Sequence, residues 1–275
     1  MRKLILLLAL CLPTLAHADD TLAKKKALEL INSTVQIENK DSQGTGIILY
    51  SEISEDDPRI KKTYVLTNEH VVEKGDAACK VSTFVFLKQR NTVGKRQYDA
   101  KVVFISDDYD IALVEIETPI TENFKTVKIA STESWDEMTL CDKVYLVSCG
   151  AGTVPCLTKG TLSSVNKAET EMGMTASIIF GSSGGGIYNS KGELIGLANA
   201  VKVTRQGRHP IPHKALGIPL TTILKEIENS DYDFILEEAD EAPELEGIPD
   251  DWHWEEDNSQ PQIEPQGEPK KKVWF

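Results

Sequence analysis

Three short strings carry side chains whose types suit acyl transfer: His70 follows an apolar run, Asp110 opens one, and Ser183 lies in Gly181-Ser-Ser-Gly-Gly185. A serine hydroxyl attacks a carbonyl well only when a base removes its proton. Imidazole suits that task near neutral pH, and a carboxylate fixes the imidazole tautomer. Glycines beside the serine let backbone N–H groups turn toward a developing oxyanion. The three residues together predict a catalytic triad.

Each string alone is also typical of ordinary structure. A histidine after a strand, an aspartate before one and a Gly-Ser turn are common in proteins that catalyse nothing. Their order along one chain, His, Asp and then Ser, favours the triad over three unrelated turns.

The segments around these strings are short and rich in β-branched residues. We expect strands over 46–50, 64–66, 81–87, 101–105, 111–116, 143–147, 161–165, 174–180, 186–188, 194–201 and 215–218. Many short strands with few helices indicate an all-β sandwich or a pair of barrels. Asn189-Ser-Lys-Gly192 is typical of a hairpin turn. Helices are expected at the two ends of the body, over Asp20–Asn32 and Pro219–Glu228.

The first eighteen residues have the pattern of a signal peptide. A basic start and the apolar run Leu4–Leu15 precede Ala16-His-Ala18, a small-x-small cleavage site. The run is shorter than the roughly 20 residues of a spanning helix, although a retained membrane anchor is the alternative. Cys11 suggests a lipoprotein site, but the bulky leucine before it disfavours one. We expect an exported chain, periplasmic or secreted, that begins near Asp19 and does not stay inserted in a membrane.

Four cysteines remain after such a cleavage, an even number in an oxidising compartment. Disulfides are therefore expected, and three pairings of Cys79, Cys141, Cys149 and Cys156 stay open. Cys149 and Cys156 bracket a loop that suits a local bridge. A zinc site is the alternative, but no Cys-x-x-Cys spacing occurs.

The net charge of −13 is concentrated at the C-terminal end. From Asp231 onward, fifteen acidic residues face three lysines, so the body is nearly neutral. A neutral body argues against nucleic-acid binding, which needs a basic face. The tail over 231–275 is expected to be disordered. Its apolar end, Val273-Trp-Phe275, could dock in the chain's own groove or on a partner, and Trp252-His-Trp254 is a second candidate contact.

His209 and His213 have the spacing of some metal-binding pairs. The prolines between them deny that segment a helix, which favours an exposed loop over a metal site. We expect no metal and no cofactor.

Taken together, the motifs resemble those of trypsin-like proteases, and within them the HtrA (Deg) type, from about Val35 to Ile227. The strings that carry the resemblance are Gly44-Thr-Gly46, Thr67-Asn-x-His70-Val, Asp110-Ile-Ala-Leu, Gly181-x-Ser183-Gly-Gly, Leu194-Ile-Gly196 and Leu216-Gly-Ile-Pro219. The resemblance implies an all-β, chymotrypsin-like fold of two six-stranded antiparallel barrels, with a short N-terminal and a C-terminal helix. It also implies a serine endopeptidase that acts on unfolded or exposed protein segments.

The same resemblance assigns roles. Ser183 would be the nucleophile, His70 the general base and acid, and Asp110 the orienting carboxylate. The N–H groups of Gly181 and Ser183 would form the oxyanion hole. Ser182 is the competing hydroxyl, but it lies one place early in the motif, and a cysteine-nucleophile variant fails because serine occupies the position.

Two departures from the family pattern matter. Ser182 stands where the HtrA type usually has Asn and trypsins have Asp, so no trypsin-like zymogen activation is expected. In the trypsin-like alignment the specificity pocket falls on Ser177, Ile178, Ala198, Asn199 and Ala200. None is a carboxylate, which favours apolar or small P1 residues over Lys or Arg.

The expected organisation is one protease domain over 19–230, with the boundary between its barrels near 120–140, and no PDZ domain after it. A function of a different class stays open: a catalytically silent, secreted binding module of the same fold.

Overall fold

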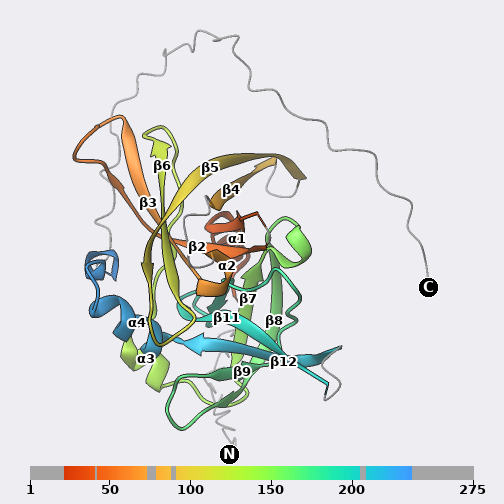
Figure 1. Ribbon diagram of the computed structural model, residues 1–275. Coiled ribbons are helices and arrows are strands. Elements are labelled where there is room, and N and C mark those ends of the chain that lie inside the picture. The colour runs from red at the N-terminus through yellow and green to blue at the C-terminus, as the bar shows by residue number, and fades with distance from the viewer. Residues whose placement is uncertain (1–21, 41, 73–78, 88–90, 205–208, 237–275) are drawn as a thin grey trace, which may run out of the picture.

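The computed structural model describes residues 22–40, 42–72, 79–87, 91–204 and 209–236, which form two closed barrels of six antiparallel strands each (Figure 1). The first barrel contains β1 Thr34–Glu38, β2 Gln43–Ile53, β3 Ile60–Thr67, β4 Cys79–Leu87, β5 Asn91–Ile105 and β6 Ala112–Pro119. The second contains β7 Lys143–Ser148, β8 Cys156–Val165, β9 Met172–Met174, β10 Gly186–Tyr188, β11 Leu194–Val203 and β12 Pro210–Pro219. The predicted fold class is confirmed.

The helical elements are few and short. They are α1 Lys24–Asn32, α2 Glu69–Val72, α3 Thr132–Asp136, α4 Leu220–Glu228 and the 3₁₀ turns η1 Gly150–Gly152 and η2 Asp233–Leu236. Both terminal helices lie within their predicted ranges. No helix among the described residues is long and apolar enough to span a membrane.

A shared apolar cluster joins the two barrels. Ile111 and Leu113 of the first barrel pack in it with Leu197 and Ile218 of the second, and Ile223 of α4 lies among them. All five side chains are almost fully buried. Because an apolar core of this kind excludes water and packs at close to crystal density, it fixes how the barrels face each other.

One predicted strand and one predicted loop differ from the structure. The strand predicted over 174–180 is wrong, since β9 ends at Met174 and the following residues form an irregular loop. Ile179 and Phe180, which gave that segment its strand-like pattern, are 52% and 79% exposed. The loop predicted at 209–213 is largely the start of β12, where Val203 pairs with Pro210. By contrast, the predicted hairpin turn is confirmed: the N–H of Gly192 donates to the carbonyl of Asn189 at 3.0 Å.

The expected disulfides are absent from the described part of the chain, where all four cysteines are free thiols. The local bridge between Cys149 and Cys156 does not form, because the first is buried below the turn after β7 and the second is exposed at the start of β8. Burial raises the pKa of the Cys149 thiol to about 12, so this residue is an inert core thiol.

The fold continues past its predicted end at residue 230. Tyr232 and Phe234 pack against Tyr50 and Tyr64 of the first barrel, with the rings of Tyr64 and Phe234 edge to face at 5.4 Å. Ile235 is 2% exposed. The remaining tail, with Trp252–Trp254 and Val273–Phe275, lies outside the described residues, as do the signal-peptide pattern and Cys11.

Replacing Ile235 by Ala should lower the free energy of unfolding by about 2–4 kcal/mol, because it leaves a cavity where η2 covers the first barrel. Urea unfolding would measure the change. Asp233→Ala, on the exposed side of the same turn, is the matched control and should change stability by less than about 0.5 kcal/mol. An unchanged midpoint for Ile235→Ala would mean that η2 is not part of the cooperative fold.

Candidate active site

The side chain of His70 is positioned by the short helix α2. Val71 and Val72, the next two residues, are buried in the core of the first barrel. The carbonyl of Val71 accepts hydrogen bonds from the Asn39 amide at 3.0 Å and the Ser42 hydroxyl at 3.1 Å. The imidazole projects from this fixed turn with 51% of its side-chain surface exposed.

Asp110 holds the imidazole and the turn beneath it. Its Oδ2 lies 2.7 Å from Nδ1 of His70, and its Oδ1 accepts the His70 backbone N–H at 3.0 Å. Because a carboxylate only accepts, Nδ1 carries the proton and Nε2 is left with its lone pair. The Asn68 amide donates to the backbone carbonyl of Asp110 at 2.7 Å, so the main chain that carries the carboxylate is itself held in place.

The pKa of His70 is raised from its ordinary value. The main cause is the hydrogen bond from the ring to Asp110; partial burial opposes it, and the negative charges of Asp110 and Glu69 add to it. An imidazole with a raised pKa is a stronger base, which is what proton removal from a hydroxyl requires.

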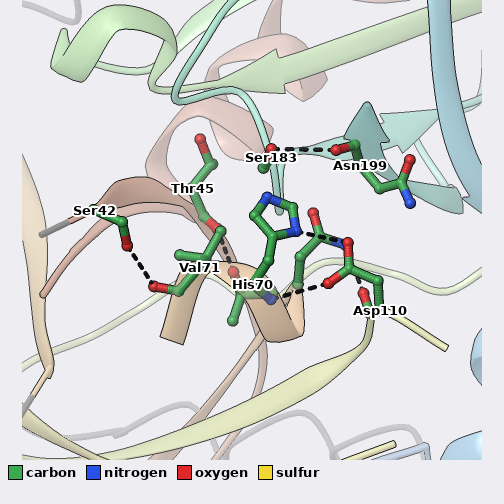
Figure 2. Close-up of polar contacts among 9 residues, drawn as sticks. Ser42, Thr45, His70, Val71, Asp110, Ser183 and Asn199 are labelled. Atoms are coloured by element: carbon green, nitrogen blue, oxygen red, sulfur yellow. Dashed lines mark hydrogen bonds and ion pairs between the residues drawn. The ribbon is translucent and has the colours of Figure 1, made fainter. Parts of the chain in front are cut away.

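Ser183 lies on the opposite side of the imidazole. Figure 2 shows the ring of His70 between Asp110 and Ser183, with the nitrogen that is not bonded to Asp110 facing the serine. The Ser183 hydroxyl donates instead to the carbonyl of Asn199 at 3.3 Å. The structure thus brings all three predicted residues together, with the pair His70–Asp110 bonded and the serine turned toward β11.

The neighbouring hydroxyl of Ser182 is used differently. It is 1% exposed, accepts a hydrogen bond from the Ser148 hydroxyl at 3.0 Å, and also accepts the Ile179 N–H at 3.3 Å. A buried hydroxyl held in this way supports the loop from below and is remote from solvent.

Two backbone N–H groups in the loop over residues 181–185 make no hydrogen bond within the described structure. The N–H groups of Ser182, Gly184 and Gly185 all donate to carbonyls, whereas those of Gly181 and Ser183 have no acceptor among the described residues. The carbonyl before Gly181 is held by the N–H of Ala151 at 2.6 Å. Since a peptide's N–H and C=O point in opposite directions, this bond turns the Gly181 N–H outward.

Thr45 connects the loop that carries Ser183 to the first barrel. Its hydroxyl donates to the carbonyl of Gly181 at 2.8 Å and accepts the Cys149 N–H at 2.9 Å, and its N–H donates to the carbonyl of Ser183 at 2.7 Å. The residue is fully buried. The sequence analysis placed Thr45 and Asn68 in motifs but gave them no role. The feature that could have indicated a role is a polar side chain between two glycines, for Thr45, and two residues before His70, for Asn68.

The predicted pocket residues are only partly brought together. Ala198 exchanges hydrogen bonds with the loop, since its N–H donates to Gly185 and its carbonyl accepts from Gly184, each at 2.8 Å. Asn199 follows it and accepts from Ser183, and Ala200 is the next residue of β11. Two further predicted members come from the loop after β9: Ile178 packs against the second-barrel core, and Ser177 is exposed with its carbonyl bonded to the Thr158 hydroxyl at 3.1 Å.

The trypsin-like peptidase domain family matches this chain over residues 44–197, a span that contains all three site residues. The chain belongs to this family. The resemblance to the HtrA (Deg) type is confirmed by relatives of this chain that are named as Deg proteases. The periplasmic pH-dependent serine endoprotease DegQ of Escherichia coli is 32% identical over 165 residues, which cover 58% of this chain and 31% of the relative. DegP of Salmonella typhimurium is 31% identical over 147 residues, covering 51% and 28%. The chain therefore spans about a third of the length of these relatives.

Solved structures share the fold of this peptidase domain. The crystal structure of Deg5 superposes with a TM-score of 0.55 at 21% identity, covering 73% of this chain and 91% of Deg5. A serine endoprotease from Yersinia pestis gives 0.54 at 19% identity, covering 79% and 68%. At these identities the likeness extends to the fold alone.

Gly184→Ala should disrupt the loop that carries Ser183. Gly184 has φ +82°, and an added Cβ would lie 2.0 Å from the backbone oxygen of Thr45. The left-handed conformation alone costs about 1–2 kcal/mol for an L-residue, and the overlap adds to it. We expect a loss of more than about 2 kcal/mol in urea unfolding. Gly94→Ala, where a Cβ meets open space, is the control; equal effects would refute the assigned loop conformation.

Proposed function

We propose that this chain is an exported serine endopeptidase that hydrolyses peptide bonds in unfolded or exposed protein segments. One observation carries the proposal: His70 bonds Asp110 through one ring nitrogen while the other faces Ser183. That is the relation in which a carboxylate orients an imidazole and the imidazole takes a hydroxyl proton.

In the first step, Ser183 turns its hydroxyl from Asn199 to Nε2 of His70. Oγ then attacks the scissile carbonyl as its proton passes to Nε2, and Asp110 stabilises the imidazolium. The proton next passes to the leaving amine, which departs and leaves an acyl group on Ser183. Water, deprotonated by His70, hydrolyses this acyl-enzyme and returns the serine.

The outward N–H groups of Gly181 and Ser183 would receive the oxyanion. Neither N–H has an acceptor among the residues that the structure describes, which leaves both available to a substrate. Such a donor acts where negative charge develops, and losing one costs about 3 kcal/mol of transition-state stabilisation.

Export and substrate class rest on the sequence and on the relatives. The pattern over residues 1–18 is that of a signal peptide. DegQ and DegP are named as periplasmic serine endoproteases, which supports a periplasmic endopeptidase here.

One observation favours a second candidate, a catalytically silent binding module. The Ser183 hydroxyl is bonded to the carbonyl of Asn199, not to His70. A protein that has no use for the serine could keep it in that position permanently.

Labelling with a fluorophosphonate separates the two functions, because the probe reacts only with an activated serine. The wild-type chain should be labelled and Ser183→Ala should not. Ser182→Ala is the matched control: it removes the adjacent hydroxyl and should still be labelled, although more slowly than the wild-type chain, because the loop loses the hydrogen bonds of that hydroxyl to Ser148 and Ile179. A folded wild-type chain that resists the probe would favour the binding module.

The labelling rate should rise with pH, with its midpoint above 6.5. The reason is that only neutral His70 can accept the proton, and its pKa is raised. Activity is therefore lost as pH falls through that raised value. Asp110→Asn should move the midpoint to lower pH and reduce the maximum by orders of magnitude, about 10⁴-fold in a related triad. A pH-independent rate between 5 and 9 would exclude His70 as the base.

Cleavage of a peptide library should show apolar or small P1 residues. Ala198 and Ala200 carry no charge, and Asn199 offers only an amide. Without a carboxylate, a P1 Lys or Arg would be desolvated with no partner. Strict cleavage after Lys or Arg would contradict this expectation.

A further inference from the structure

Glu226 lies on α4, at the end of the chain's fold, yet it reaches the loop that carries Asp110. The Ser106 hydroxyl donates to Oε2 of Glu226 at 2.7 Å, although 120 residues separate the two. Ser106 is 2% exposed and closes the end of β5. The contact joins a helix that follows the second barrel to a turn of the first.

The same hydroxyl organises the turn. It accepts the N–H of Asp108 at 3.3 Å and that of Tyr109 at 3.0 Å. The Ser106 N–H also donates to the carbonyl of Ile111 at 3.0 Å. Asp110 therefore lies inside a closed turn whose centre is the oxygen of Ser106.

The hydroxyl proton of Ser106 is donated to Glu226. With two N–H groups already bound to its oxygen, its proton is directed at Glu226. A hydrogen bond to a carboxylate is short and about twice as strong as a neutral one. If the carboxylate were removed, a buried hydroxyl proton would lack its acceptor, and the turn would rearrange to satisfy it.

Glu226 is itself held firmly. Ile223 and Ile227 on the same helix are buried in the cluster between the barrels. The hydroxyl of Thr222, one turn earlier, donates to the carbonyl of Glu169 at 3.0 Å. A rigid helix can thus transmit its position to the turn.

We propose that Glu226 is a positioning residue that fixes the Asp110 carboxylate against His70 by holding the Ser106 hydroxyl. This inference rests on the proposed peptidase function for its effect on rate. The effect of Glu226 on the pKa of His70 does not depend on catalysis. That pKa is raised by Asp110 and Glu69 in the resting protein, so a displaced Asp110 changes it whether or not a substrate is hydrolysed.

The test compares Glu226→Ala, Glu226→Gln, Ser106→Ala and the double alanine variant, all in the full chain. Glu226→Ala should lower kcat for a peptide substrate about tenfold with KM nearly unchanged, because a misplaced orienting group affects the transition state more than binding. Glu226→Gln, whose carbonyl still accepts from Ser106, should retain at least about a third of the rate. The double variant should be no slower than the slower single variant.

NMR titration of the His70 ring supplies the readout that a general loss of stability would not move. A loosened Asp110 should let the pKa of His70 fall toward its ordinary value, which also moves the acidic limb of the rate profile to lower pH. The matched control is Glu228→Ala, which removes the same charge from an exposed position on the same helix and should change neither quantity. Thermal unfolding of each variant identifies any that fail to fold. If Glu226→Ala does not fold, Ser106→Ala takes its place in the test, because it removes the same hydrogen bond from the other side.

Three results would overturn the proposal: an unchanged His70 pKa in both Glu226→Ala and Ser106→Ala, additive losses in the double alanine variant, or equal losses in the Ala and Gln variants of Glu226. The last would assign the effect to charge alone. If the wild-type chain hydrolyses no peptide but the His70 pKa still falls in Glu226→Ala, the peptidase proposal fails and the positioning role stands.

Discussion

The hydrogen bond between His70 and Asp110 is the interaction around which the rest of the site is arranged. Strand pairing brings the two residues together: Thr67 at the end of β3 pairs with Ala112 at the start of β6. His70 follows the first and Asp110 precedes the second, so both leave the barrel at the same end. A shift of one residue in this register would turn the side chains of one strand to the other face and separate the pair.

The serine comes from the other barrel, so its place depends on contacts across the boundary. Thr45 supplies them, because its side chain and backbone both bind the loop that carries Gly181 and Ser183. Gly184 allows β2 to approach that loop more closely than any side chain would. The apolar cluster between the barrels stabilises the arrangement, and these hydrogen bonds set its detail.

Local patterns in the sequence predicted an all-β fold and grouped His70, Asp110 and Ser183 as a candidate site, and the family resemblance supplied the two six-stranded barrels. His, Asp and Ser each follow or open an apolar run, which places them at strand ends without knowledge of the fold. The link between Ser106 and Glu226 could not be found this way, because it joins residues 120 positions apart and neither lies in a motif. The strand expected at 174–180 failed because the last two apolar residues of that segment, Ile179 and Phe180, are exposed in a loop. Local patterns do not tell a buried strand from an exposed apolar loop.

The parts of the site differ in how firmly they are held. Asp110 is fixed by three hydrogen bonds to His70 and Asn68, whereas the Ser183 hydroxyl makes one bond of 3.3 Å, to Asn199. Breaking a neutral bond of that kind costs about 1 kcal/mol, which corresponds to about a fivefold reduction in rate. Staggered side-chain rotamers exchange by rotation about one bond, without movement of the backbone. The orientation of Ser183 therefore costs far less than the several orders of magnitude that a triad contributes, and it is compatible with a site whose backbone is already assembled.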